Sequence, residues 1–198
     1  MTIIDKTDFL EKMKHVQQIV LENLMIHDEF ANYFNFLNLQ GYKRMHENEY
    51  LENVIKNRLI NRYILTKKLL PANVNNFPSF NIIPHDWHTV DPLTISADYT
   101  LKAVKDAFSV YLERMEYSKE HVEKIAIYFS QKGDLITYSF LNDMVKHYDK
   151  DIKYLTRYMA CLNKAESIDY IMEKQDSMHD EYRDDLPNLV KPLMEVKY

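Results

Sequence analysis

The sequence predicts a single-domain, all-α protein. Of its 198 residues, 46% are hydrophobic and only 2 are glycine, so long stretches contain no residue that breaks a helix. Within these stretches apolar residues recur at steps of three and four, which is the period of a helix with one buried face. We expect helices over about residues 8–40, 43–70, 96–132, 134–162 and 165–182.

The first two helices should form an antiparallel hairpin. Thr7 is expected to cap the first helix, and Gly41 is expected to end it. The second helix starts almost at once and stops before Pro71, because proline has no amide hydrogen for the helical hydrogen bond. So little chain separates the two helices that they must turn back on each other.

A long ordered crossover should follow, over residues 71–95. This segment contains four prolines and several asparagines, and apolar residues such as Trp87 can anchor it to the helices. The third helix is expected to end at Gly133, and the fourth to begin at Asp134. Two hairpins joined by one crossover give a four-helix bundle, with a short fifth helix and a tail over residues 183–198.

Charge and cysteine content exclude several classes of function. The net charge of −5, with a pI of about 5.9, argues against nucleic-acid binding, which needs a basic face. No segment approaches roughly 18 uncharged apolar residues, so we expect neither a membrane span nor an export signal. Cys161 is the only cysteine, which excludes an intrachain disulfide and suits a reducing compartment. The expected location is the cytoplasm.

Three stretches resemble the ferritin family. They are "LENLMIHDEFANYF" in the first helix, "IIPHDWHTVDPLTISADYTLKAV" across the start of the third, and "GDLITYSFLNDMVKHYDKDIKYL" in the fourth. Their order and spacing cover about residues 8–162, and the short last helix lies where many ferritins have a fifth. The resemblance implies a ferritin-like bundle that holds iron with carboxylates and histidines and oxidises Fe(II) with O₂. It also implies a hollow homo-oligomeric cage, of 24 subunits as in the larger ferritins.

The resemblance implies metal ligands on each of the four long helices. On the first helix the family's glutamate position falls on Asp28, while His27 lies nearer the centre of the apolar stripe, and either could bind metal. On the second helix the family's glutamate and histidine fall on Asn53 and Lys56, neither of which is a useful iron ligand. The usual Glu-x-x-His motif is therefore absent.

A shifted alignment of the second helix offers Glu49 and Glu52, three residues apart. Arg58 and Arg62 are expected near the buried side, where they could neutralise carboxylates that would otherwise hold a second iron. The third helix offers Glu113 or Glu116, depending on the end from which it is aligned, although the periodicity places Met115 inward.

On the fourth helix the family's two ligands map to Tyr148 and Asp151, and His147 is adjacent to them. A carboxylate on a buried stripe is strongly disfavoured unless it is paired or bound to metal. Asp151 and His147 could instead hydrogen-bond each other or an arginine as a structural pair. Tyr148 could serve as an electron donor.

The predicted function is an iron-storage ferritin that binds one or two iron ions per subunit and oxidises Fe(II) at an atypical centre inside the bundle. Asp151, His147 and Tyr148 are the predicted catalytic residues. The predicted metal ligands are His27, Asp28, Glu49, Glu52, Glu113, Glu116, His147 and Asp151. Two alternatives remain open, namely a ferritin-like cage without ferroxidase activity and a metal-free helical interaction protein.

Overall fold

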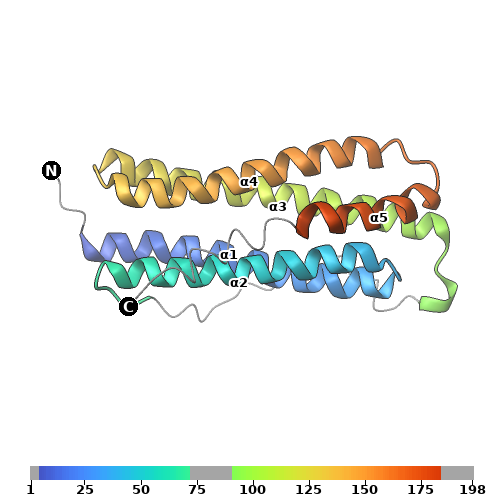
Figure 1. Ribbon diagram of the computed structural model, residues 1–198, viewed down its shortest axis with the longest axis horizontal. Helices are drawn as coiled ribbons and strands as arrows, with labels where there is room; N and C mark the ends of the chain where they lie inside the picture. The colour runs from blue at the N-terminus through green and yellow to red at the C-terminus, as the bar shows by residue number, and fades with distance from the viewer. Residues whose placement is uncertain (1–4, 72–90, 184–198) are drawn as a thin grey trace.

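The computed structural model describes residues 5–71 and 91–183, and this part of the chain is helical, without strands (Figure 1). Its elements are α1 (Lys6–Phe36), α2 (Gln40–Thr66), the short 3₁₀ helix η2 (Pro92–Thr94), α3 (Ala97–Gln131), α4 (Leu135–Leu162) and α5 (Ile168–Arg183). The predicted all-α class is confirmed. Most of the predicted crossover and of the predicted tail lies outside the described residues. In the described part, no helix combines the length and the apolar character needed to cross a membrane.

Polar side chains cap three of the long helices at their N-termini. Asp5 caps α1, because its side chain accepts a hydrogen bond from the Thr7 amide at 3.3 Å. Thr7 itself therefore lies inside the first turn and is not the cap that the sequence predicts. Ser96 caps α3 and Asp134 caps α4 in the same way, with acceptor distances of 3.1 and 3.0 Å.

The two glycines have different roles from each other. Gly133 has a φ of 81° and follows α3, as predicted for a helix-ending glycine. Gly41 does not end α1, which stops at Phe36; it lies buried in the first turn of α2. A Cβ atom at Gly41 would lie 2.3 Å from the backbone oxygen of Gln175, so glycine here permits the close approach of α5.

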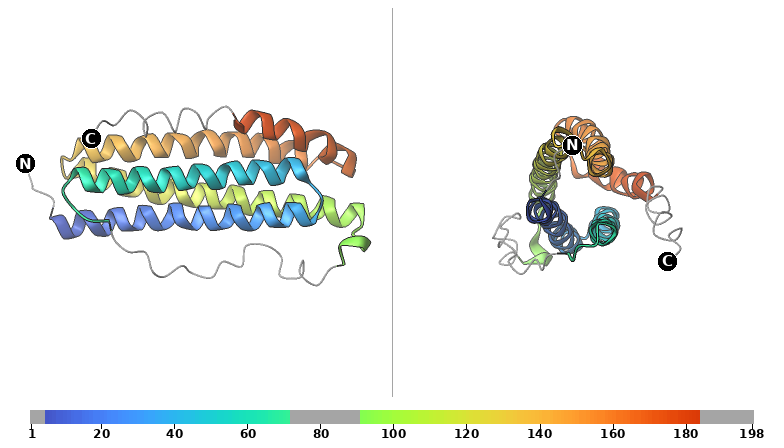
Figure 2. Two further views of the ribbon diagram at one scale, coloured as in Figure 1. Left: turned by 60° about the horizontal axis from the view of Figure 1, so that its bottom comes forward. Right: turned by 90° about the vertical axis from the view of Figure 1, so that its left-hand side faces the viewer.

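The long helices form two antiparallel hairpins, α1–α2 and α3–α4, which lie alongside each other (Figures 1 and 2). α1 packs against α3, and α5 packs against α2 and α3. The C-terminal end of α2 adjoins the start of α4, since the hydroxyls of Tyr63 and Thr137 are hydrogen-bonded at 2.7 Å. α2 thus ends beside the α3–α4 turn, whereas α3 begins at the opposite end of the bundle.

Aromatic side chains fill the core near the α1–α2 turn. Phe34, Tyr42 and Phe108 are fully buried, with ring centroids 5.1 to 5.8 Å apart. The hydroxyls of Tyr42 and Tyr158 are hydrogen-bonded to each other, which joins α2 to α4. Burying a large apolar side chain stabilises a fold by about 1.5–3 kcal/mol, so this layer holds both hairpins in register beside the polar groups described next.

Candidate functional site in the bundle interior

Polar side chains from all four long helices lie inside the bundle. Apart from Arg114, none of them is more than 5% exposed. We call this set the interior polar cluster: Glu22, Asn23 and His27 from α1; His46, Glu49, Asn53 and Lys56 from α2; Arg114 and Ser118 from α3; and Tyr148 from α4. Buried polar groups are costly unless they are paired, so their partners define what the cluster can do.

Arg114 connects α3 to α1 through a charged hydrogen bond. Its guanidinium donates to Glu22 Oε2 at 2.6 Å and to Asn23 Oδ1 at 2.7 Å. The side-chain amide of Asn23 donates in turn to Ser118 Oγ at 3.0 Å and lies 3.5 Å from the Tyr148 hydroxyl. Three helices therefore meet at Asn23, and the Glu22 carboxylate is neutralised by an arginine.

Lys56 places a second positive charge in the cluster. Its ammonium is 2.6 Å from Glu52 Oε1 and 5.2 Å from the ring centroid of Tyr148. Burial alone would lower the pKa of Lys56, but Glu52 raises it most strongly and Tyr148, Asp151 and Glu49 raise it further, so that it ends above its ordinary value. The side chain is therefore protonated at neutral pH, and it neutralises the carboxylate beside it.

His27, His46 and Glu49 form the third part of the cluster. The Nδ1 atoms of the two histidines are 2.9 Å apart, so one ring donates a hydrogen bond to the other. Burial lowers the pKa of His46 to about 3, and burial followed by the nearby charges lowers that of His27 well below its usual value. Both imidazoles are neutral at pH 7. His27 Nε2 makes no hydrogen bond and lies 3.9 Å from Glu49 Oε2.

The cluster does not supply the di-iron ligand set that the resemblance to ferritins implies. In the part of the chain that the structure describes, no group of three or more His, Cys, Asp or Glu residues could hold a metal ion. Glu22 is engaged by Arg114 and Glu52 by Lys56, at 2.6 Å in both pairs. Two protein cations thus lie beside the carboxylates that a pair of iron ions would need.

The structure brings two of the predicted ligands together on α1 and α2. His27 and Glu49 are buried and face each other, whereas Asp28 is exposed. Glu52 is only partly buried and is the partner of Lys56.

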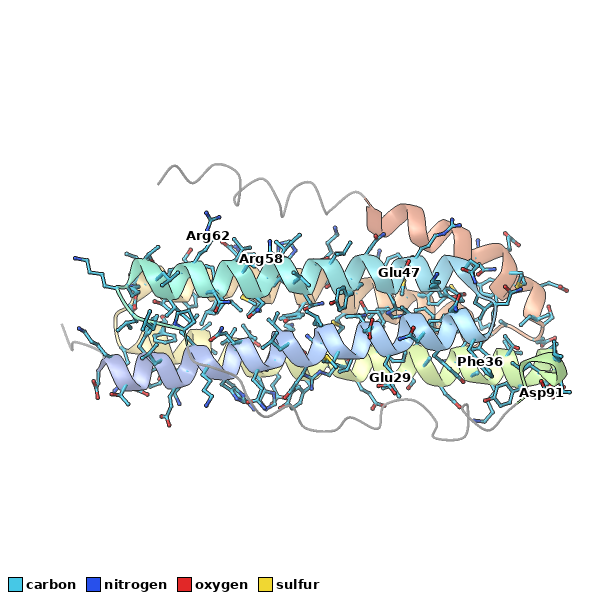
Figure 3. The ribbon with its side chains drawn as sticks, turned by 90° about the horizontal axis from the view of Figure 1, so that it is seen from below. Glu29, Phe36, Glu47, Arg58, Arg62 and Asp91 are labelled. Carbon is cyan, nitrogen blue, oxygen red and sulfur yellow. The ribbon has the colours of Figure 1, made fainter. Side chains whose placement is uncertain are left out.

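The arginines predicted near the buried side of α2 lie elsewhere. Arg58 is exposed and Arg62 is half-buried, and both side chains point away from α1 (Figure 3). The internal cations are instead Lys56 and Arg114, on the inner faces of α2 and α3.

On α3 and α4 the predicted residues separate. Glu113 and Glu116 are exposed, because α3 turns Met115 and Ser118 inward, as the periodicity indicates for Met115. Tyr148 is buried within the cluster. His147 and Asp151 are half-buried beside it, and Asp151 acts electrostatically on Lys56.

Seven members of the cluster are not among the predicted site residues, namely Glu22, Asn23, His46, Asn53, Lys56, Arg114 and Ser118. His46 precedes Glu49 by three residues and Asn23 precedes His27 by four, so each of these two shares a helix face with a predicted ligand. That spacing is the signal that could have identified His46 and Asn23. Glu22 is 5% exposed and paired with Arg114, because α1 is rotated so that Asn23 faces inward and Leu24 only partly so.

In comparisons with known proteins, no family model matches the chain, and no curated protein matches it.

Proposed function

We propose that this chain is a ferritin-like subunit whose bundle centre is neutralised by internal cations, and that it builds an iron-storing cage without oxidising Fe(II) at that centre. The order of the helices supports the ferritin-like part of the proposal. Two antiparallel hairpins lie side by side, and α2 ends at one end of the bundle whereas α3 begins at the other. The interior polar cluster, which all four long helices supply, supports a common origin with bundles that bind metal between their helices.

The observation that carries the proposal is the buried Lys56. Its ammonium holds Glu52 and has Tyr148, Asp151 and Glu49 as further electrostatic partners. A divalent ion in the same place would meet this positive charge at short range in a medium of low dielectric constant, where like charges repel strongly. Arg114 adds a second positive charge across the bundle, with Glu22 as its partner.

The test is the rate of Fe(II) oxidation by the purified protein in air. We expect ferric absorbance to develop no faster than with an equal mass of an unrelated acidic protein. Glu52→Gln and Asp151→Ala should leave that rate unchanged, because neither carboxylate binds iron. A wild-type rate clearly above the control, reduced by either substitution, would refute the proposal.

A second candidate, the ferroxidase, is favoured by the contact between His27 and Glu49. A neutral imidazole nitrogen without a hydrogen-bond partner faces a buried carboxylate, and both are ligand types that suit iron. At a separation of 3.9 Å both groups could contact a single ion, so one Fe(II) could bind there as substrate.

The same assay separates the two candidates. If iron is oxidised at His27 and Glu49, then Glu49→Gln and His27→Gln should slow the reaction, while Glu52→Gln should not. If oxidation occurs only on an already formed mineral surface, none of the three variants should differ from the wild type in its initial rate.

A further inference from the structure

A pair of histidines lies on the surface between α1 and α3, apart from the interior polar cluster. The rings of His15 in α1 and His121 in α3 have centroids 6.0 Å apart and planes inclined at 50°. His15 is exposed and His121 is half-buried, so solvent and solutes reach both rings. These residues are far apart in the sequence, and they meet only because the first hairpin packs against the second through these two helices.

The ring of His121 is held in one orientation. Its Nδ1 lies 2.8 Å from the backbone oxygen of Tyr117, and a carbonyl oxygen can only accept, so Nδ1 carries the proton. The ring also lies against that of Tyr117, at a centroid distance of 3.9 Å, and Arg114 covers the Tyr117 ring at 4.7 Å. With Nδ1 as the donor, the lone pair available to a metal ion is on Nε2, which is the arrangement that outer partners impose on metal-binding histidines.

The pKa of His15 is lowered by burial, and the neighbouring His121 lowers it further, because two imidazolium charges would repel. Neutral imidazole is the form that binds metal.

We propose that His15 and His121 together bind one divalent transition-metal ion, of the zinc, nickel or copper class, with water in the remaining positions. Imidazole nitrogen is a preferred ligand of these ions. With a metal–nitrogen bond of about 2.0–2.1 Å, the ion lies about 3 Å from each ring centroid, so a centroid distance of 6.0 Å is close to the largest at which two rings can share one ion. The site has two protein ligands, and water completes the coordination.

Such an ion would act as a clamp between the two hairpins. α1 belongs to one hairpin and α3 to the other, so an ion bound by both can be retained only while the hairpins are docked. A ligand that binds the folded state alone stabilises it by RT ln(1 + L/Kd), where L is the free concentration of the ion, so the stabilisation rises with that concentration.

The experiment is thermal unfolding of tag-free, chelator-treated full-length protein with and without Zn²⁺. The wild type should show a higher unfolding temperature with Zn²⁺ and no comparable change with Mg²⁺, which prefers oxygen ligands. His15→Gln and His121→Gln should each lose the zinc-induced shift while keeping the far-ultraviolet circular dichroism of the wild type. His147→Gln, on α4, is the matched control and should keep the shift.

Two results would overturn the proposal: a wild type that does not respond to zinc, or a response that survives in both the His15→Gln and the His121→Gln variants. The second result would assign the binding to other histidines. Because the pair lies outside the interior polar cluster, a negative zinc result leaves the expected Fe(II) oxidation rate unaffected, and the two proposals fail separately.

Discussion

At the scale of single residues, the buried ammonium of Lys56 is the most important group for the proposed function. Its pair with Glu52 lies in an interior where an unpaired charge is expensive, and no solvent can replace a lost partner at the buried end. The same side chain lies over the ring of Tyr148, so that Lys56 packs against Tyr148 and also neutralises Glu52.

Lys56→Met should destabilise the fold by on the order of 3 kcal/mol, because it removes one partner of a buried ion pair. The measurement is the free energy of unfolding in urea. The matched control is the double variant Lys56→Met/Glu52→Gln, which leaves no unpaired carboxylate and should recover part of the loss. A double variant less stable than the sum of the two single variants would contradict this account of the pair.

The two buried histidines make stability depend on pH. The pKa of His46 falls from its ordinary 6.5 to about 3 on folding, and that of His27 also falls, so the unfolded chain binds more protons in acid. The stability that they contribute is complete above the unfolded pKa and is lost as pH falls from about 6.5 towards 3.

Urea midpoints measured between pH 7 and pH 4 should therefore decline, and the decline should be shallower in His46→Phe. Phenylalanine suits the site, since the rings of Phe30 and Phe34 lie 4.9 and 5.3 Å from that of His46. Equal slopes in the wild type and in His46→Phe would show that the buried pair does not titrate on unfolding.

At the scale of helices, the local sequence pattern predicts the helices themselves but not the residues of the site. The 3.6-residue period and the scarcity of glycine and proline predict the long helices, and the short connection predicts the α1–α2 hairpin. Helix ends are less determined: Asp5 and Thr7 are both capping residues, and only the backbone path decides between them.

The interior depends on how far each helix is rotated, which a single sequence specifies poorly. His27 is predictable because it interrupts an apolar stripe, whereas Glu49 is offered only by a shifted alignment of the second helix. Arg114 is not predictable in this way, since a polar residue at the edge of a stripe faces solvent or a partner according to the helix opposite. Whether Lys56 replaces a ligand or lies on the surface is likewise settled by tertiary packing.

Gly41→Ala tests how α5 is held. The added methyl would meet the backbone of Gln175 and disturb the hydrogen bond from the Gly41 amide to Gln175 Oε1, at 3.1 Å. Since backbone cannot move aside cheaply, we expect a loss of about 1–3 kcal/mol, with faster amide exchange in α5. Gly133→Ala is the control: its φ of 81° strains an alanine, but no atom lies near the added methyl, so α5 should keep its protection. Unchanged exchange in α5 of Gly41→Ala would contradict this role.

At the scale of the whole molecule, the proposed cage is tested by mass in solution. A chain of 23.8 kDa that assembles as proposed should elute as a particle of several hundred kilodaltons, and light scattering would give its copy number. A monomer of the chain mass would instead support the metal-free interaction protein. Addition of a chelator should leave a cage intact, because the bundle centre is neutralised by Lys56 and Arg114 and needs no ion.

The charged hydrogen bond between Arg114 and Glu22 also bears on the order of events during folding. The two residues are separated by 92 positions in the sequence and belong to different hairpins, so they meet only after both hairpins have formed and docked. Interactions made after the rate-limiting step retard unfolding and leave the folding rate unchanged. Stopped-flow measurements on Arg114→Met should therefore show much faster unfolding with an unaltered refolding rate. The charges inside this bundle would then determine the lifetime of the native state.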